Sequence, residues 1–398
     1  MRFVLASTAC AFFSNVFLSL YWYHYVYGSS FLHLHQEQAV PRHSSLSPEA
    51  YPVYGIRADF QNESTVVYAI PNSNDSPPKG IVVLLHACTH NALKFFAPSS
   101  TCPDCIGLSE EMRLARIVLE RGYLALAVTA SSNGGCWGGD KDINAIKTAL
   151  KGLKENMGIG TTVYALGASS GGSMAAKLVA EGVAVSAGVM VMGLRDQLLD
   201  TILALQDGNK KLYLAPMTRD KGTTQRVRDN QAHWKEKKQQ LHQKEQQAHE
   251  MIVDEVSCVP LPMTANYLWN RVPGMTYDAA KTIVNVLLKH KHLDPKTMKL
   301  IVDPTRSNWR DFFLKENEVP VQATFRKSII NNNDNPKSIL LWGTFDLTPG
   351  ISPLAKALHR AWAMHEYCSE IVEHALDFFE GQKTRDEILG ILQKQQIE

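Results

Sequence analysis

The sequence predicts an α/β fold, with a mostly parallel central sheet, helices on both of its faces and a helical insert. Beyond residue 52, short apolar runs typical of buried strands alternate with longer amphipathic runs typical of helices. Two opening strands followed by this alternation build a sheet that is covered on both faces. With 398 residues, 45% of them hydrophobic, the chain is long enough to bury a large core.

The charged residues are nearly balanced, with 41 Lys and Arg against 39 Asp and Glu. A net charge of +2 supplies no basic surface for a phosphate backbone, so no nucleic-acid partner is predicted. The 25 glycines and 18 prolines are close to average numbers, which excludes collagen-like and low-complexity classes. An enzyme or a binding module is expected.

Residues 1–28 are predicted to be a signal peptide or a signal-anchor. No charged residue lies within Phe3–Gly28. The apolar core of a secretory signal has about 7–15 residues, and a spanning helix needs about 20. This stretch is intermediate between the two, so a cleaved signal and a retained anchor are both open. The aromatic residues at its far end favour an anchor, because such rings prefer the membrane–water interface. A buried N-terminal helix of a cytosolic protein is the third interpretation. Residues 29–52, rich in Ser, Pro and His, are predicted to be a linker.

The leader predicts a secretory location, lumenal or extracellular, and leaves membrane attachment through residues 3–28 open. Two further patterns agree with this location. Asn62 and Asn74 begin Asn-x-Ser triplets and are candidate glycosylation sites. One cysteine, Cys10, lies in the leader, and an even number follows it, as expected in an oxidising compartment. These six are Cys88, Cys102, Cys105, Cys136, Cys258 and Cys368.

The main domain is predicted to span residues 53–381, and its first half reads as regular strand and helix alternation. A helix is expected to start at Ser109, with acidic residues in its first turn, and to stop at Gly122. The expected strands are Val53–Phe60, Ser64–Ile70, Ile81–Leu85, Tyr123–Val128, Thr161–Leu166, Val183–Met192 and Lys211–Pro216, with further helices at Lys141–Asn156 and Gly172–Ala180.

The second half is predicted to be mainly helical. Residues 219–250 read as one long polar helix, in which a thin apolar stripe recurs every seven positions through Val227 and Trp234. A solvated helix docked by that stripe is favoured over a coiled-coil partner surface, because the complementary positions are polar. A strand at Glu255–Pro260, a mainly helical insert at 261–350 and a polar C-terminal tail at 382–398 follow.

The pentad Gly167-Ala168-Ser169-Ser170-Gly171 matches G-x-S-x-G, with Ser169 at its centre. It lies between an expected strand and an expected helix, as a nucleophile elbow requires. The glycines are needed because a Cβ at either position would collide with the neighbouring strand or helix. A glycine-rich turn without chemistry is the alternative.

A nucleophilic serine needs two N–H donors for the oxyanion of its intermediate. The N–H of Ser170 at the helix start is one candidate. In enzymes with such an elbow the other donor comes from the loop after an earlier strand, here the loop after Ile81–Leu85, which makes the N–H of Cys88 the second candidate. A zinc site built from His86, Cys88, His90 and the pair Cys102 and Cys105 is conceivable. Disulfides Cys88–Cys136 and Cys102–Cys105 are preferred, and no metal or other cofactor is predicted.

The chain resembles the α/β-hydrolase superfamily and, more narrowly, an uncharacterised plant- and protist-type serine hydrolase family. This resemblance covers about residues 80 to 380 and implies a serine hydrolase fold with no established substrate. The matching runs are Leu85–His90, Cys102–Leu108, Cys136–Trp137, Ala165–Gly172, Arg271–Gly274 and Ala361–Glu370, the last with His365-Glu366 inside.

The superfamily places nucleophile, acid and histidine in that chain order. Asp220, just after strand Lys211–Pro216, is the candidate acid, with a helix-capping role as the alternative and Asp346 as the second choice. The resemblance favours His365 as the base, because similar chains carry a His-Glu pair at this place. Other histidines that follow the acid are His290, His292 and His359.

Together these residues predict a serine hydrolase that cleaves a carboxylic ester or an amide of a small molecule or lipid through an acyl-enzyme. The alternative is a non-catalytic lumenal binding or scaffold protein that keeps the same fold. The helical insert is expected to form a lid or a wall of the substrate site, because it lies between the acid and the histidine in the sequence.

Overall fold

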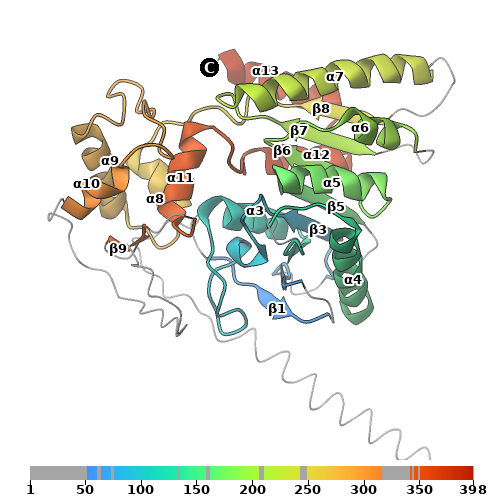
Figure 1. The fold of residues 1–398 in the computed structure, drawn as a ribbon, viewed down its shortest axis with the longest axis horizontal. Coiled ribbons are helices and arrows are strands. Elements are labelled where there is room, and N and C mark those ends of the chain that lie inside the picture. Colours follow the sequence, from blue (N-terminus) through green and yellow to red (C-terminus); the bar gives the residue numbers. More distant parts are fainter. Residues whose placement is uncertain are drawn as a thin grey trace, which may run out of the picture. The chain divides into compact units, whose positions relative to one another are not determined.

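The protein is described by a computed structural model. It describes residues 52–60, 64–72, 76–131, 135–157, 162–205, 210–242, 249–315, 341–342, 345–347 and 350–397. A sheet in the order β1-β2-β4-β3-β5-β6-β7-β8 organises this part of the chain (Figure 1). Strands β1 and β2 are antiparallel to their neighbours, and every other pairing in this sheet is parallel. The predicted fold class is therefore confirmed.

The strands of the sheet agree with the apolar runs of the sequence, apart from the last one. Most are buried on both faces, which explains why they read as continuous rather than alternating hydrophobic segments. Their bounds are β1 Ile56–Ala58, β2 Val66–Ala69, β3 Ile81–Leu85, β4 Leu124–Val128, β5 Val163–Ala168, β6 Ser186–Met190, β7 Lys211–Ala215 and β8 Glu250–Val253.

Helices cover both faces of the sheet. On one face, α3 (Ser109–Glu120), α12 (Ile371–Glu380) and α13 (Arg385–Ile397) share a buried apolar cluster with alternate strand residues. On the other face, a second cluster joins the sheet to four helices. These are α4 (Asp140–Met157), α5 (Ser170–Ala180), α6 (Asp196–Leu203) and α7 (Lys221–His242). The chain thus forms the three-layer arrangement expected for a mostly parallel sheet.

Three expectations about the elements are wrong. No helix was predicted between the strands Val183–Met192 and Lys211–Pro216, but α6 lies there, between β6 and β7. The long polar helix is shorter than 219–250, because α7 is Lys221–His242 and residue 250 already belongs to β8. The last strand is Glu250–Val253 rather than Glu255–Pro260, since the side chain of Asp254 accepts the N–H groups of Val256 and Ser257 and turns the chain there.

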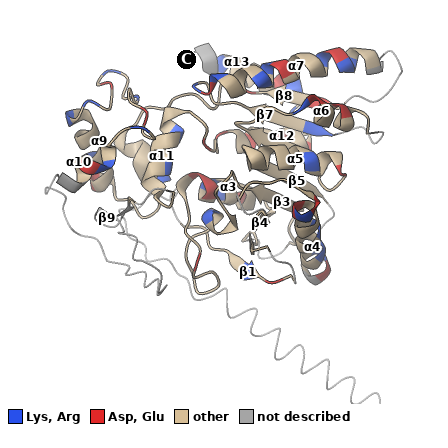
Figure 2. Cartoon of the chain, viewed as in Figure 1, with Lys and Arg blue, Asp and Glu red and all other residues tan. Residues whose placement is uncertain are grey.

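Helix α7 docks by the expected stripe, because both Val227 and Trp234 are buried. The polar position between them is also buried: the side chain of Asn230 bonds both the N–H and the C=O of Leu194, at 2.7 and 2.8 Å. Elsewhere α7 carries charged residues of both signs, with more Lys and Arg than Asp and Glu (Figure 2). This element is a surface helix of the sheet layer.

The described residues between β8 and α12 form four helices with an apolar cluster of their own. Two short strands, β9 (Leu341–Trp342) and β10 (Phe345–Asp346), pair with each other in the same segment. Threonine and serine side chains cap three of the helices by accepting the N–H of Tyr267, Ala279 or Ala355. The helices are α8 Ala265–Arg271, α9 Tyr277–Lys289, α10 Trp309–Lys315 and α11 Pro353–Trp362 (Figure 1).

The segment that was predicted to be a polar C-terminal tail contains a helix, α13, which packs against the rest of the fold. Ile388 and Leu392 of α13 are buried in the cluster beneath the sheet. Among the described residues, the helices are all too short or too polar to cross a membrane. The predicted leader at residues 1–28, residues 29–51 of the predicted linker at 29–52, and the triplet asparagines Asn62 and Asn74 lie outside the described residues.

Candidate active site

Ser169 occupies a sharp turn between β5 and α5. Its φ of 55° and ψ of −123° lie outside the regions that a non-glycine residue normally adopts, and its N–H donates to the C=O of Met190 at 2.9 Å. Such backbone strain is typical of functional sites. Nearby, Thr89, Val191 and His365 also have positive φ angles. The turn holds the hydroxyl of Ser169 above the end of the sheet.

The two glycines of the pentad are required by close backbone approach. A Cβ at Gly167 would lie 2.3 Å from the C=O oxygen of Gly171. A Cβ at Gly171 would lie 2.3 Å from the C=O oxygen of Leu85 at the end of β3. Because backbone atoms rather than flexible side chains would be struck, any larger residue at either position forces the elbow apart.

The structure brings the three predicted triad residues together. The imidazole Nε2 of His365 lies 2.9 Å from Oγ of Ser169, and its Nδ1 lies 3.0 Å from Oδ2 of Asp220. A carboxylate only accepts hydrogen bonds, so Nδ1 carries the proton and Nε2 is free to accept the serine proton. The side chain of His365 is 50% exposed, whereas that of Asp220 is only 16% exposed.

Asp220 makes the contacts expected for both roles considered for it. It stands directly before α7 and accepts the N–H and the hydroxyl of Thr223, at 3.1 and 2.7 Å, as a helix cap does. Burial by itself raises the pKa of the Asp220 carboxyl, but hydrogen bonds from His365 and Thr223 outweigh it and lower the pKa below its ordinary value. The carboxylate therefore stays ionised beside the imidazole.

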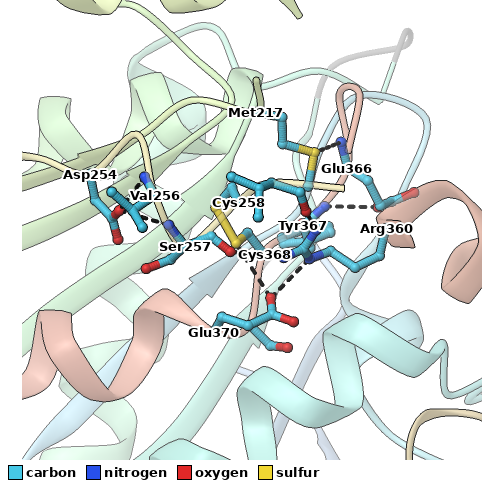
Figure 3. The surroundings of a disulfide bond; sticks show 12 residues. Met217, Asp254, Val256, Ser257, Cys258, Arg360, Glu366, Tyr367, Cys368 and Glu370 are labelled. Atoms are coloured by element: carbon cyan, nitrogen blue, oxygen red, sulfur yellow. Dashed lines mark hydrogen bonds and ion pairs between the residues drawn. A yellow bond between two sulfur atoms is a disulfide. The ribbon is translucent and has the colours of Figure 1, made fainter. Parts of the chain in front are cut away.

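His365 reaches the serine from a loop between α11 and α12 that is fixed at several points. Cys368 in this loop is joined by a disulfide to Cys258, which follows β8 (Figure 3). The hydroxyl of Tyr367 donates to the C=O of Leu85 at 3.2 Å and accepts the N–H of Ala87 at 2.9 Å. Tyr367 thus connects the histidine loop to the loop after β3. These tethers place His365 although it lies 196 residues from Ser169 in the sequence.

The alternative acid and bases have other surroundings. Asp346 lies in the β9–β10 ribbon. His290 stacks on the ring of Phe312, with centroids 4.0 Å apart, and His292 contacts the same ring edge to face. The histidine of α11, His359, lies 3.6 Å from the carboxylate of Glu366.

The loop after β3 carries the first candidate oxyanion donor. Cys88 is joined to Cys136 by a disulfide, and the N–H of the neighbouring Thr89 donates to the C=O of Gly135 at 3.2 Å. The second candidate, the N–H of Ser170, is the first of α5, where helix geometry leaves N–H groups without an intrahelical acceptor. Cys88 and Ser169 line one cavity.

The thiols needed for the zinc hypothesis are consumed by the Cys88–Cys136 and Cys102–Cys105 disulfides. His86 is fully buried and accepts the N–H of Ala130 on Nε2 at 2.9 Å. Burial lowers the pKa of His86 to about 4, so its imidazole is neutral and serves the backbone of this loop. No cluster of potential metal ligands occurs among the residues that the structure describes.

The cavity in front of Ser169 has a volume of about 140 Å³ and is lined by polar residues whose place at this site was not predicted from the sequence. Lys356 of α11 lies on its wall with His90 and Glu366. The Lys356 amine donates to Oε2 of Glu366 at 2.9 Å and to Nε2 of His90 at 3.1 Å. The signal available in the sequence was the adjacency of Glu366 to His365. Lys356 gave none, because a lysine on an amphipathic helix normally faces solvent.

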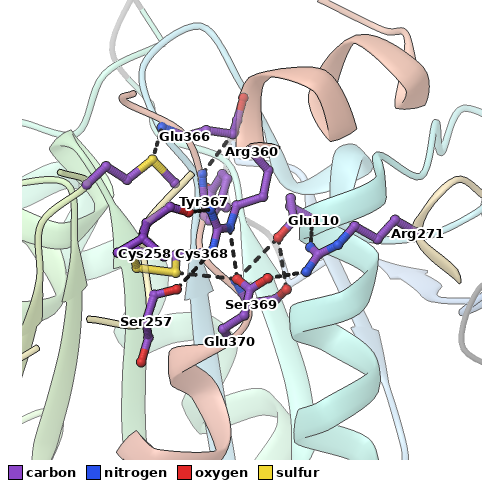
Figure 4. A network of polar contacts seen from close by, with 12 residues as sticks. Glu110, Ser257, Cys258, Arg271, Arg360, Glu366, Tyr367, Cys368, Ser369 and Glu370 are labelled. Carbon is purple, nitrogen blue, oxygen red and sulfur yellow. Dashed lines mark hydrogen bonds and ion pairs between the residues drawn. A yellow bond between two sulfur atoms is a disulfide. The ribbon is translucent and has the colours of Figure 1, made fainter. Parts of the chain in front are cut away.

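A second buried polar network supports the histidine loop from behind. Arg360 of α11 donates to Glu370 at 2.9 Å and to the C=O groups of Ser257 and Val259, both at 3.0 Å (Figure 4). Arg271 of α8 donates to Glu370 and to Glu110 of α3. The network therefore ties the helical segment to the sheet layer beside the Cys258–Cys368 disulfide.

Comparisons with solved structures find α/β hydrolases at low similarity. An esterase from Pyrococcus furiosus is 16% identical, with a TM-score of 0.35, over 52% of this chain and 83% of that one. A lidless α/β serine hydrolase from Xanthomonas campestris is 13% identical, with a TM-score of 0.32, over 51% and 84%. A fluorophosphonate-binding serine hydrolase of Staphylococcus aureus is 11% identical, with a TM-score of 0.33, over 60% and 98%.

No protein-family model and no curated protein matches the chain. The α/β-hydrolase fold is recognised from the strand order of this chain and from the elbow that follows β5. The narrower resemblance to a plant- and protist-type family stays a prediction.

Proposed function

We propose that this chain of α/β-hydrolase fold is a serine hydrolase that cleaves a carboxylic ester or amide through Ser169, His365 and Asp220. One observation carries the proposal: the imidazole of His365 lies within hydrogen-bond distance of both the serine hydroxyl and the aspartate carboxylate. A positioned base next to a hydroxyl, itself oriented by a carboxylate, is the arrangement that activates a serine nucleophile.

In the proposed reaction, Oγ of Ser169 forms a bond to the substrate carbonyl carbon while its proton passes to Nε2 of His365. The resulting oxyanion accepts the N–H groups of Cys88 and Ser170. His365 then gives the proton to the leaving alcohol or amine as its bond to the carbonyl carbon breaks. Water, deprotonated by the same imidazole, releases the acid and restores Ser169. Asp220 keeps the imidazole in the required tautomer and stabilises its charged form.

The direct test is covalent labelling of the full chain by a fluorophosphonate, which reacts with an activated serine hydroxyl. We expect one label per chain, located at Ser169 by peptide mass spectrometry, and none in Ser169→Ala. His365→Ala is expected to react far more slowly, because the hydroxyl has lost its base.

Ser173→Ala is the matched control, since it removes another hydroxyl of the same turn region and is expected to label normally. A folded wild-type protein that stays unlabelled, or a label on a different serine, would contradict the proposed mechanism. The first result would favour the non-catalytic binding protein.

We also propose an oxidising compartment, which agrees with a secretory location. The support is that all six cysteines after the leader form three disulfides, Cys88–Cys136, Cys102–Cys105 and Cys258–Cys368. The test is alkylation of the protein from its native source, with and without prior reduction. We expect these six cysteines to be alkylated only in the reduced sample. Full alkylation of these cysteines without reductant would contradict the proposal. Membrane attachment through residues 3–28 stays a prediction.

A further inference from the structure

The cavity beside Ser169 is small and has a charged wall. A cavity of about 150 Å³ accommodates benzene, so a volume of about 140 Å³ suits a group of roughly six non-hydrogen atoms. Besides hydrophobic residues such as Ala168 and Val191, its lining includes Lys356, His90 and Glu366. The proposed catalysis of Ser169, His365 and Asp220 uses none of these three polar side chains.

The hydrogen bonds of Lys356 are only partly satisfied by the protein. A protonated amine has three N–H donors, and within the described part of the chain Glu366 and His90 accept two of them. In the tautomer whose Nδ1 donates to Oε1 of Glu111 at 2.8 Å, Nε2 of His90 is the acceptor of the Lys356 amine. The third N–H of Lys356 therefore remains for a group inside the cavity.

The amine remains charged in this setting. Burial lowers the pKa of Lys356, but the carboxylates of Glu366 and Glu111 more than compensate and raise it above its ordinary value. The formal charges of the neighbourhood are balanced, with Lys94 and Lys356 facing Glu111 and Glu366. A neutral acceptor suits such a site better than an additional anion, since no positive charge is left uncompensated.

A purely structural explanation accounts poorly for this ion pair. Replacing a buried ion pair by packed apolar side chains is often neutral or stabilising, so the pair at this wall gives the fold no clear advantage. Its side chains are only 11% and 5% exposed, yet both line the cavity that holds the serine hydroxyl. Placement at the reactive serine points to recognition of substrate.

We propose that Lys356 is a specificity-determining residue of this hydrolase, donating a hydrogen bond to a neutral oxygen in a short acyl group of the substrate. The inference rests on the proposed function. The preferred substrates are then esters or amides of short oxygen-bearing acids, such as alkoxy or hydroxy acids, because a cavity of this volume favours short acyl groups over long alkyl chains.

The test compares acyl groups of equal size with and without an oxygen. In p-nitrophenyl butanoate and methoxyacetate, a CH₂ is exchanged for an ether oxygen. Pentanoate and 3-methoxypropanoate place that oxygen one atom farther along. The measured quantity is kcat/KM for the oxygen ester divided by kcat/KM for its alkyl partner. Dividing the wild-type ratio by the variant ratio cancels the intrinsic reactivity of each ester.

We expect Lys356→Met to lower this ratio about tenfold for at least one pair, the value of one hydrogen bond from a charged donor. Lys356→Met removes the lysine partner of Glu366, so Lys356→Met in a Glu366→Gln background is compared with Glu366→Gln alone, and circular dichroism checks folding. Lys94→Met is the matched control. Lys94 is a buried lysine of the same neighbourhood that donates to the C=O of Gly350 at 3.0 Å, and its removal is expected to leave the ratio unchanged.

Unchanged ratios for both pairs in a folded Lys356 variant would overturn the inference, as would an equal loss in Lys94→Met. Hydrolysis that depends on Ser169 but not on Lys356 would leave the proposed function intact. If the wild-type protein hydrolyses none of the four esters, the result would count against both proposals.

Discussion

Ser169→Ala is expected to lower kcat by about five to six orders of magnitude, and His365→Ala by a similar factor. In the proposed mechanism the serine hydroxyl and the imidazole act as one unit, because Oγ becomes a nucleophile only when Nε2, 2.9 Å away, accepts its proton. The double variant is therefore expected to be no slower than either single variant by more than a few-fold. Independent contributions would instead multiply.

Asp220→Asn should cost less, about 10⁴-fold, because it leaves the base in place but favours the wrong tautomer. All four variants are assayed on an activated short-chain ester, with Ser173→Ala as the control that retains wild-type kcat. Multiplicative losses in the double variant, or wild-type rates in His365→Ala, would show that Ser169 is activated by some other group.

Local patterns in the sequence predict the elements that surround this site, because each is fixed by neighbouring residues. The continuous apolar run Ile81–Leu85 is a strand buried on both faces, with the bounds that were predicted. The helix at Ser109 likewise starts at its acidic first turn, and Gly122, just beyond its end, has a φ of 84°. The elbow at Ser169 is readable because its glycines serve contacts within a few residues.

The remaining features depend on contacts between distant segments. Helix α6 was missed because Asp196–Leu203 has only eight residues, and so short an amphipathic run is ambiguous. The loop of His365 is placed by Tyr367 and by the Cys258–Cys368 disulfide, whose partners lie far away in the sequence. Lys356 joins the cavity only because α11 packs beside the loop after β3. The periodicity of a sequence does not reveal contacts between segments that lie far apart in the chain.

Arg360→Met is expected to destabilise the protein by about 3–5 kcal/mol, as measured by the free energy of unfolding in denaturant. The Arg360 side chain is fully buried and bonds a carboxylate and two carbonyl groups. Methionine fills a similar volume, but it leaves the C=O groups of Ser257 and Val259 without this donor and removes one of the two cations beside Glu370. These carbonyls flank Cys258, so the anchor of the histidine loop is weakened as well.

Arg228→Met is the matched control, because Arg228 also binds a carboxylate, that of Glu255, through two nitrogens but lies on the surface. We expect little change in that variant, since exposed ion pairs contribute little. Equal effects of the two substitutions would contradict the importance of burial. Combining Arg360→Met with Glu370→Gln should recover part of the loss, because the carboxylate that lost its partner is then neutral.

The same network makes stability depend on pH in a defined direction. Burial raises the pKa of the Glu370 carboxyl, but the cations of Arg360 and Arg271 outweigh burial and hold the pKa well below its ordinary value. The unfolded chain therefore binds a proton at a higher pH than the folded protein does. The stabilisation from Glu370 is complete above its unfolded pKa and is lost as the pH falls toward the folded pKa. Between about pH 5 and about pH 3, the unfolding free energy of the wild-type protein should decline more steeply than that of Glu370→Gln. Parallel slopes would mean that Glu370 has the same proton affinity in both states, in which case its pairing with the two arginines does not hold the histidine loop in solution.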